Sequence, residues 1–85
     1  MRTTKEYELK VGDNKVTLPM DHVLLDVIVN EEKIVAIIEI DTEDREICDV
    51  PLLLTELGEE IRTSYLEPFC CLVFKGKVVT VWEVL

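Results

Sequence analysis

Two neighbouring runs of this chain are apolar on both of the faces that a β-strand presents. From His22 to Asn30, every second residue is valine or leucine, which makes one face apolar. Leu24 and Ile28 add apolar side chains to the other face. The run from Ile34 to Ile40 is apolar on both faces as well, and the polar residues between the two runs are typical of a turn. Because both faces of such a strand need cover, the pattern predicts two central strands of one sheet.

Two shorter strands are predicted before this pair. Lys5 to Val11 alternates between apolar and charged residues, which is the pattern of a half-buried strand. The alternation resumes from Lys15 to Leu18, after a turn at Gly12-Asp13-Asn14. Because a short turn of this composition favours a β-hairpin, we expect these two strands to pair with each other, with Pro19 closing the hairpin.

A further hairpin is predicted at the C-terminal end of the sequence. Phe69 to Phe74 and Val78 to Leu85 are rich in β-branched and aromatic residues, which favour strands. Lys75-Gly76-Lys77 separates them and is typical of a tight turn.

The segment between these strands, residues 50–61, supports two interpretations. Its apolar residues fall at helical spacing, and Pro51 suits the first turn of a helix. Gly58 opposes a helix, because glycine costs about 1 kcal/mol relative to alanine in a helix interior. We expect a short helix, and an irregular strand interrupted at Gly58 is the alternative. The residues at helical spacing are Val50, Leu53, Leu54, Leu57 and Ile61.

Together these elements indicate a mainly β fold: a compact antiparallel sandwich or barrel of about six short strands, with at most one short helix near residues 50–61. The chain of 85 residues shows no linker or repeat, so a single domain, 1–85, is expected. Its hydrophobic fraction of 48% is high for so small a body, which predicts a homo-oligomer. The predicted interface is the second face of the two central strands, formed by Leu24, Ile28, Val35 and Ile37.

Charge narrows the classes of partner. Eighteen acidic residues stand against nine basic ones, a net charge of −9 at pH 7. This charge opposes direct binding to nucleic acid or to anionic lipid. No apolar run reaches the roughly 18 residues of a membrane span, and the first residues lack the apolar core of a signal peptide, so we expect a cytoplasmic location. Cys48, Cys70 and Cys71 are expected to be reduced thiols.

The side chains that catalysis needs are few. His22 is the single histidine, so one chain cannot form a two-histidine zinc site. The acidic run from Asp41 to Glu46 lacks the glycine and the final carboxylate of an EF-hand loop. Glu59, Glu60 and Glu67 are interpreted as surface carboxylates, since a small core has little room to bury a catalytic pair. We therefore expect no metal, no cofactor, no catalytic residue and no enzymatic activity.

One polar run has the chemistry to hold a small anionic ligand. Arginine binds phosphate through two parallel hydrogen bonds and an aromatic ring stacks on a base, so together they can hold a nucleotide. The lysines of the last predicted turn would add positive charge if the fold brings them near. An ordinary polar loop is the alternative interpretation. The candidate ligand-binding residues are Arg62, Thr63, Ser64, Tyr65, Lys75 and Lys77.

Several short motifs follow one another along nearly the whole chain. They are Lys5-Glu6-Tyr7-Glu8-Leu9, Val16-Thr17-Leu18-Pro19, the apolar hairpin from Leu24 to Asp41, Thr55 to Ile61, Tyr65 and Val81-Trp82-Glu83-Val84-Leu85. In this order they resemble an uncharacterised family of short bacteriophage proteins. The family's glycine-rich turn keeps only Thr55 and Gly58 here, and Glu83 stands where the family has a histidine. The resemblance implies a mainly β fold and a viral origin, and therefore a location in the host-cell cytoplasm. It does not assign an activity.

Two function hypotheses follow. The first is a non-enzymatic phage-type binding protein that counteracts host defence, as an oligomer that sequesters a small nucleotide signal. The alternative is an acidic protein–protein inhibitor that mimics nucleic acid and occupies a host nuclease or effector. The first hypothesis needs a basic pocket inside an acidic shell, and the second needs a contiguous carboxylate surface.

Overall fold

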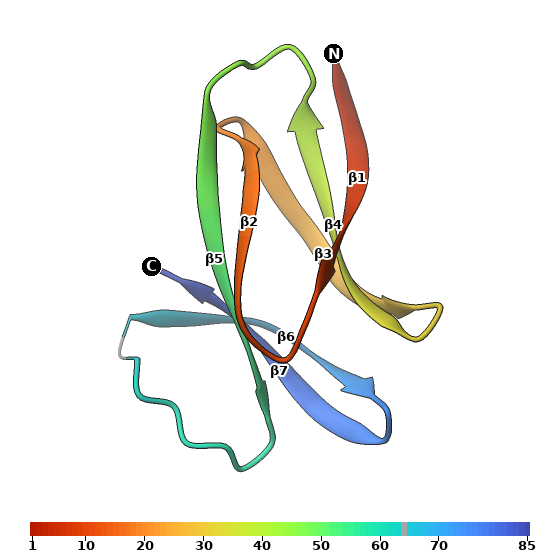
Figure 1. The fold of residues 1–85 in the computed structure, drawn as a ribbon, viewed down its shortest axis with the longest axis vertical. Helices are drawn as coiled ribbons and strands as arrows, with labels where there is room; N and C mark the ends of the chain where they lie inside the picture. The colour runs from red at the N-terminus through yellow and green to blue at the C-terminus, as the bar shows by residue number, and fades with distance from the viewer. Residues whose placement is uncertain (64) are drawn as a thin grey trace.

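The chain folds into two antiparallel β-sheets (Figure 1). The computed structural model describes residues 1–63 and 65–85, which contain no helix and therefore none that is long and apolar enough to cross a membrane. The first sheet has the order β1-β4-β3 and the second the order β2-β5-β7-β6, and neither closes into a barrel. The sandwich predicted from the sequence is confirmed. The strands are β1 (Arg2–Leu9), β2 (Gly12–Pro19), β3 (His22–Asn30), β4 (Lys33–Asp41), β5 (Ile47–Glu56), β6 (Leu66–Phe74) and β7 (Lys77–Val84).

The core lies between the two sheets and consists of aliphatic side chains on their inner faces. β4 is the central strand of the first sheet and buries alternate residues along its length. β3, which was also predicted to be central, is an edge strand, because its outer side chains stay exposed and only β4 pairs with it among the described residues. β5, paired with a strand on each side, does the same in the second sheet. The period of two along these strands decides which residues are inside. The core residues are Leu9, Val16, Leu18, Val27, Ile34, Ala36, Ile38, Ile40, Leu52, Leu54, Val79 and Val81.

Two of the predicted hairpins are confirmed. β3 and β4 are joined through Glu31 and Glu32, whose φ angles are 52° and 64°. β6 and β7 are joined through Lys75 and Gly76, with φ angles of 51° and 75°. Positive φ at both central residues is the geometry of a type I′ turn, whose twist matches that of the strands it connects.

The hairpin predicted between the first two strands does not form. β1 pairs with β4 and β2 pairs with β5, so the two strands belong to different sheets. Asn14 holds the corner between them: its amide accepts a hydrogen bond from the Lys10 N–H at 2.9 Å and donates one to the Lys10 carbonyl at 2.8 Å. Gly12, with a φ of 109°, allows the backbone to turn there. The chain thus crosses from one sheet to the other where the sequence suggested a hairpin.

The short helix expected near residues 50–61 is absent, and the C-terminal part of β5 occupies the first half of this segment. Leu52 and Leu54 face the core, whereas Leu53 and Thr55 face the opposite side of the sheet. There Thr55 is buried and accepts a hydrogen bond from Trp82 Nε1 at 3.0 Å. A strand with apolar or covered residues on both faces imitates helical spacing, which is why the prediction was wrong.

Gly58 lies in the turn that follows the end of this strand, in agreement with the alternative interpretation. Its φ is 88°, and the Glu59 N–H donates to the Glu56 carbonyl at 3.0 Å. A positive φ at the third position of a four-residue turn is the geometry that favours glycine. The chain then continues without regular structure toward β6.

A β-bulge in β3 changes which of its side chains face the core. The register with β4 slips between Leu24 and Asp26, so the alternation has opposite phase on the two sides of the bulge. Leu24 pairs with the core residue Ile38 and packs against the core, which corrects its assignment to the predicted interface. Val23, which the uninterrupted alternation placed inside, is exposed.

The other predicted interface residues share the outer face of the first sheet, but one chain already covers part of it. Val35 is only 5% exposed, whereas Ile28 is 38% exposed and Ile37 is half-buried. The apolar surface left for a second subunit is therefore smaller than the sequence indicated. The homo-oligomer stays a prediction, and its interface on this face would be formed mainly by Val23 and Ile28.

Replacing a core leucine tests the assignment of β5. Leu54 is fully buried between the sheets, and Leu57, three residues later, is 79% exposed. We expect Leu54→Ala to lower the free energy of unfolding by about 2–5 kcal/mol through the cavity it leaves, and Leu57→Ala to change it by less than about 0.5 kcal/mol. Urea denaturation followed by tryptophan fluorescence measures both values. Equal effects would contradict the inward orientation of Leu54.

Candidate functional site

The two edges of β5 are paired over different lengths. β2 pairs with β5 from Ile47 to Leu54, whereas β7 pairs with the other edge of β5 only from Leu52 to Glu56. On that edge, residues 47–51 have no strand partner within the described part of the chain. The sheet is therefore open beside the N-terminal half of β5.

Pro51 accounts for the point at which pairing with β7 stops. The Met20 N–H donates to the Glu46 carbonyl at 2.8 Å, and the Leu57 N–H donates to the Val78 carbonyl at 3.0 Å. In an antiparallel ladder these bonds require that every second residue of β5, including Pro51, directs its backbone groups toward the β7 side. Proline has no N–H to donate, so β5 offers the end of β7 no donor at this position, which lies opposite Val84.

β3 borders the same opening from the first sheet. The Asp41 N–H donates to the Asp21 carbonyl at 3.2 Å, which sets the alternation of backbone groups at the start of β3. Val23 therefore bonds to β4, while the backbone groups of His22 and Leu24 point to the free edge of the strand. Within residues 1–63 and 65–85, β3 has β4 as its one strand partner, and no turn or loop backbone hydrogen bond reaches the N–H of either residue.

The C-terminal half of β3 lies beside β6 and is capped there. The Val27 N–H donates to Asp26 Oδ1 at 2.8 Å, and the Val27 carbonyl lies 4.0 Å from Cys70 Sγ. Burial, followed by the charges of Asp26 and Cys71, raises the pKa of the Cys70 thiol. This seam leaves His22 to Leu24 as the part of the edge that borders the opening.

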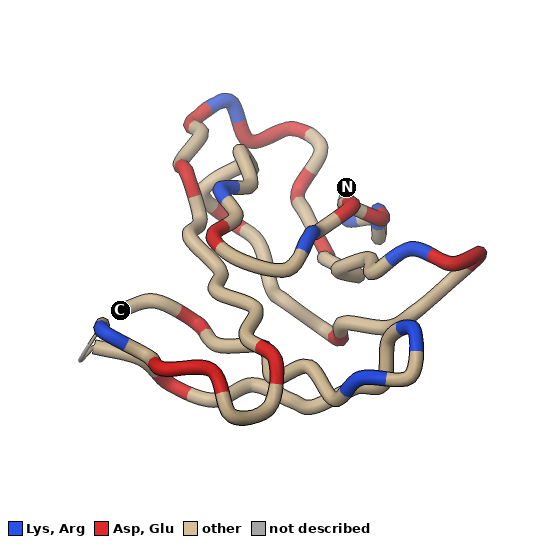
Figure 2. The backbone as a smooth tube through the Cα atoms, turned by 60° about the horizontal axis from the view of Figure 1, so that its bottom comes forward, with Lys and Arg blue, Asp and Glu red and all other residues tan. Residues whose placement is uncertain are grey.

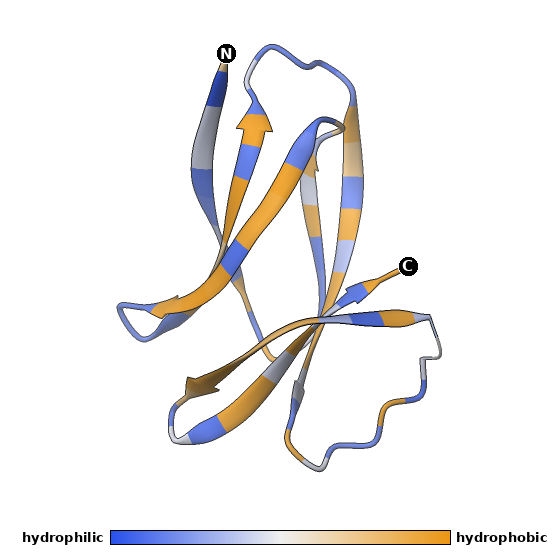
Figure 3. Cartoon of the chain, turned by 180° about the vertical axis from the view of Figure 1, so that it is seen from behind, coloured by the Kyte–Doolittle hydropathy of each residue, from blue (hydrophilic) through white to orange (hydrophobic). Residues whose placement is uncertain are grey.

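A cleft of about 330 Å³ lies between these two strand edges. Its floor is the core itself, since Leu18, Ile38 and Leu52 are each 1% exposed. Its lining includes residues of β3 and β5, and Figure 3 shows that β3 is apolar over most of its length. One imidazole and one carboxylate are the polar side chains in an otherwise apolar lining. The wall residues are His22, Val23, Leu24, Val50, Pro51, Glu83 and Val84.

This cleft is the candidate site because it combines depth, apolar walls and few polar groups, as ligand sites do. A hollow of about 370 Å³ at the corner between β1 and β2 is slightly larger. That hollow is lined by Glu8, Lys10, Asp13, Asn14 and Lys15, and it reaches the core only at Leu9. Side chains of this kind are well solvated without a ligand.

His22 has a fixed orientation in the cleft wall. Its Nδ1 lies 2.7 Å from the Pro19 carbonyl oxygen, which can only accept a hydrogen bond. Nδ1 therefore carries the proton, and in the neutral ring Nε2 is an acceptor. No binding role was predicted for His22 from the sequence, because its neighbours along the chain supply no partner. The cleft residues come from five different strands.

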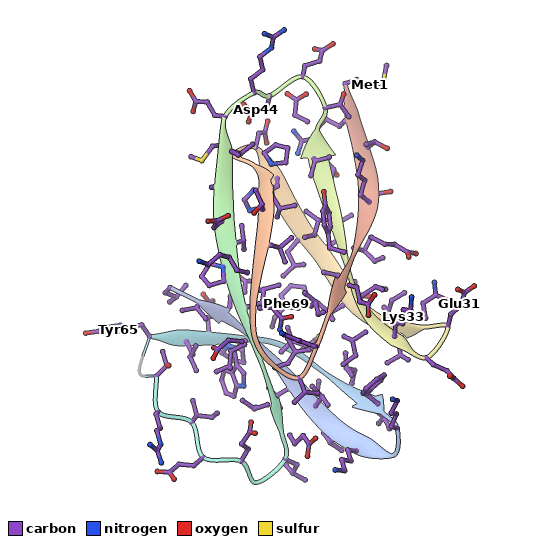
Figure 4. The ribbon with its side chains drawn as sticks, viewed as in Figure 1. Met1, Glu31, Lys33, Asp44, Tyr65 and Phe69 are labelled. Carbon is purple, nitrogen blue, oxygen red and sulfur yellow. The ribbon has the colours of Figure 1, made fainter. Side chains whose placement is uncertain are left out.

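Charges at the adjoining end of the sandwich are paired within the chain. Arg2 binds Asp21 at 2.9 Å and also binds Glu39, and the N-terminal ammonium lies 3.5 Å from Asp41 and 3.6 Å from Glu43. Figure 4 shows Met1 and Asp44 at this end. The Glu43 N–H, aided by the ammonium, lowers the pKa of Asp41. The stabilisation from the Asp41 carboxylate is therefore lost only as the pH falls through that lowered pKa.

The residues predicted to bind a nucleotide do not come together in one chain. Ser64 lies outside the described residues, and its neighbours belong to the connection before β6. The two lysines flank the turn after β6, a strand of nine residues that spans roughly 30 Å. Figure 2 shows basic residues at both ends of this part of the chain. The residues before β6 are Arg62, Thr63 and Tyr65, and those after it are Lys75 and Lys77.

Each of these basic side chains interacts with a carboxylate or an aromatic ring close to its own place in the fold. Arg62 Nη2 lies 4.0 Å from Glu60, and Lys77 Nζ lies 3.5 Å from Glu56. Lys75 Nζ lies 5.2 Å from the centre of the Phe74 ring, a cation–π contact. Tyr65 points away from the body of the molecule (Figure 4). One chain therefore presents no assembled phosphate site from this set.

Comparison with protein-family models, with curated protein sequences and with solved structures finds no match to this chain. Within the described residues, no group of three or more histidine, cysteine, aspartate or glutamate side chains is placed to hold a metal ion. The site is therefore interpreted from its own geometry.

Alkylation of the cysteines tests the seam between β3 and β6. Cys71 is exposed, whereas Cys70 is half-buried and its raised pKa disfavours the reactive thiolate. With iodoacetamide at pH 8, we expect Cys71 to be modified at least several-fold faster than Cys70, as measured by peptide mass spectrometry over time. The control is Asp26→Asn, which removes a neighbouring negative charge and should narrow the difference. Faster modification of Cys70 would contradict the packing of this seam.

Proposed function

We propose that this chain is a non-enzymatic binding protein that sequesters a ligand in the cleft between its sheets. The observation that carries the proposal is the cleft itself, in which the floor is core and the walls are two strand edges without partners. A role against host defence, taken from the bacteriophage resemblance, is part of this proposal.

The lining indicates the kind of ligand. Apart from His22 and Glu83, the side chains that line the cleft are apolar, and neither lysine nor arginine is among them. Phosphate groups favour arginine, lysine or a set of backbone N–H groups. The cleft therefore suits a neutral or cationic ligand with an apolar part better than it suits a nucleotide. A nucleotide could be held by the predicted basic residues only if several chains contributed them.

The same lining supports binding without chemical conversion. Serine, cysteine and lysine, the side chains that most often act as nucleophiles, do not line the cleft. The Pro19 carbonyl engages Nδ1 of His22 and leaves Nε2 as the acceptor, and the cleft lining offers this nitrogen no nucleophile to activate. Holding a ligand is the function that these groups support.

A neutral fluorescent probe of apolar sites, Nile red, tests the proposal. Val84 lines the cleft, and Val73 on β6 is 64% exposed and lies outside it. We expect Nile red to bind the wild-type chain, and Val84→Trp to weaken binding at least tenfold because the indole fills the cleft. The matched variant Val73→Trp should bind as the wild type does. Fluorescence titration measures the affinities, and circular dichroism checks that both variants fold.

Two results would contradict the proposal. One is the absence of Nile red binding to the wild-type chain. Titrations of apolar pockets of this size use protein concentrations in roughly the micromolar range, and the absence would have to persist at up to about 100 times those concentrations. The other is equal binding by the two tryptophan variants, which would place the probe on another surface.

A further inference from the structure

The cleft offers hydrogen-bonding groups as well as apolar surface, and these belong to the backbone of β3. The N–H and carbonyl groups of His22 and Leu24 point toward the opening, about 7 Å apart along the strand, as the alternation of an antiparallel ladder requires. This is the arrangement that an added strand recognises. We propose that the ligand of the cleft is an extended, basic and apolar peptide segment of a partner protein, which pairs with the free edge of β3. This inference rests on the proposed function.

The neighbouring edges explain why this stretch of β3 is the receptive one. On β5, Pro51 lacks the N–H that a strand added there would need. Further along β3, Asp26 already accepts the Val27 N–H. The stretch from His22 to Leu24 has neither kind of block.

The geometry of an added strand also suits the cleft. Side chains of a strand alternate between two faces, so every second residue of the peptide would enter the space between the sheets. That space has an apolar floor formed by Leu18, Ile38 and Leu52. Valine-sized and leucine-sized side chains would bury their surface there, and the residues between them would face solvent.

Charge selects among such peptides. Glu83 is the one carboxylate in the lining, no lysine or arginine accompanies it, and the chain carries a net charge of −9. This field attracts cationic segments and repels acidic ones. Basic residues that alternate with apolar ones therefore match both the solvent-facing and the cleft-facing sides of the added strand.

The probe for this inference is an eight-residue peptide of alternating valine and lysine, acetylated and amidated at its ends, titrated into the ¹⁵N-labelled protein. We expect the largest amide shifts at His22 and Leu24, because their N–H groups gain acceptors. A peptide with glutamate in place of lysine should bind at least tenfold more weakly. Raising the salt concentration should weaken binding of the lysine peptide, since part of the attraction is electrostatic.

Methylation of the peptide backbone separates strand addition from simple apolar contact. In an extended peptide, the valine N–H groups point to one edge and the lysine N–H groups to the other. Of two analogues, one methylated at the central valine nitrogens and one at the central lysine nitrogens, we expect only one to lose binding, by at least tenfold. Equal binding by both analogues, or equal loss, would overturn the pairing with β3.

A matched pair of variants tests the protein side. His22→Pro removes both the imidazole and the N–H that points to the free edge, whereas His22→Ala removes the imidazole alone. We expect His22→Pro to bind the lysine peptide at least fivefold more weakly than His22→Ala. Should His22→Pro fail to fold by circular dichroism, the methylated peptides give the same test on the wild-type chain.

The two proposals fail in different ways. Binding of Nile red in the cleft, without any shift on addition of the lysine peptide, would overturn strand addition and leave a small apolar molecule as the ligand. Loss of both kinds of binding would overturn the proposed function as well. Peptide binding that shifts residues on the outer face of β6 and leaves His22 and Leu24 unchanged would place the partner elsewhere and overturn the inference.

Discussion

The contact between the inner faces of β4 and β5 is the interaction on which the rest of this structure depends. Both strands have partners on each side, and their inward residues make up half of the buried core. Each fully buried aliphatic side chain contributes on the order of 1.5 to 3 kcal/mol. β1, β2, β3 and β7 are held by hydrogen bonds to these two strands, and β6 is held by hydrogen bonds to β7. In a chain of 85 residues there is no second layer that could replace this contact.

The edge strands are β1 and β3 in the first sheet and β2 and β6 in the second; β1, β6 and the open half of β5 carry features that discourage further pairing. β1 carries the exposed Lys5 opposite the core residue Ile38, and a charged residue at such a position discourages further pairing. β5 has Pro51, and β6 has a bulge between Pro68 and Cys70. The edge of β3 near the cleft has none of these devices and is bordered by apolar side chains. This unprotected edge is the structural basis of the proposals above.

The two earlier hypotheses fare differently against the geometry. Sequestration needs a pocket, and the cleft provides one whose lining suits an apolar or cationic ligand rather than a phosphate. Mimicry of nucleic acid needs free carboxylates in a contiguous surface. At the most acidic end of the sandwich, Arg2 and the N-terminal ammonium each bridge two carboxylates, so part of the charge is neutralised within the chain. In the proposal above, the acidic surface attracts the cationic segment of the partner.

The sequence by itself determined most of the strands, the two type I′ hairpins and the inward face of β4, because these follow from local alternation and from turns of a few residues. It did not determine that β1 and β2 join different sheets, since strand partners are chosen by packing between distant segments. The inversion at the bulge of β3, which moved Leu24 inward and Val23 outward, likewise depends on the register with β4. The cleft is the clearest case of a feature decided by tertiary structure. Its residues come from five strands, and only the end of the β5–β7 ladder at Pro51 leaves them uncovered.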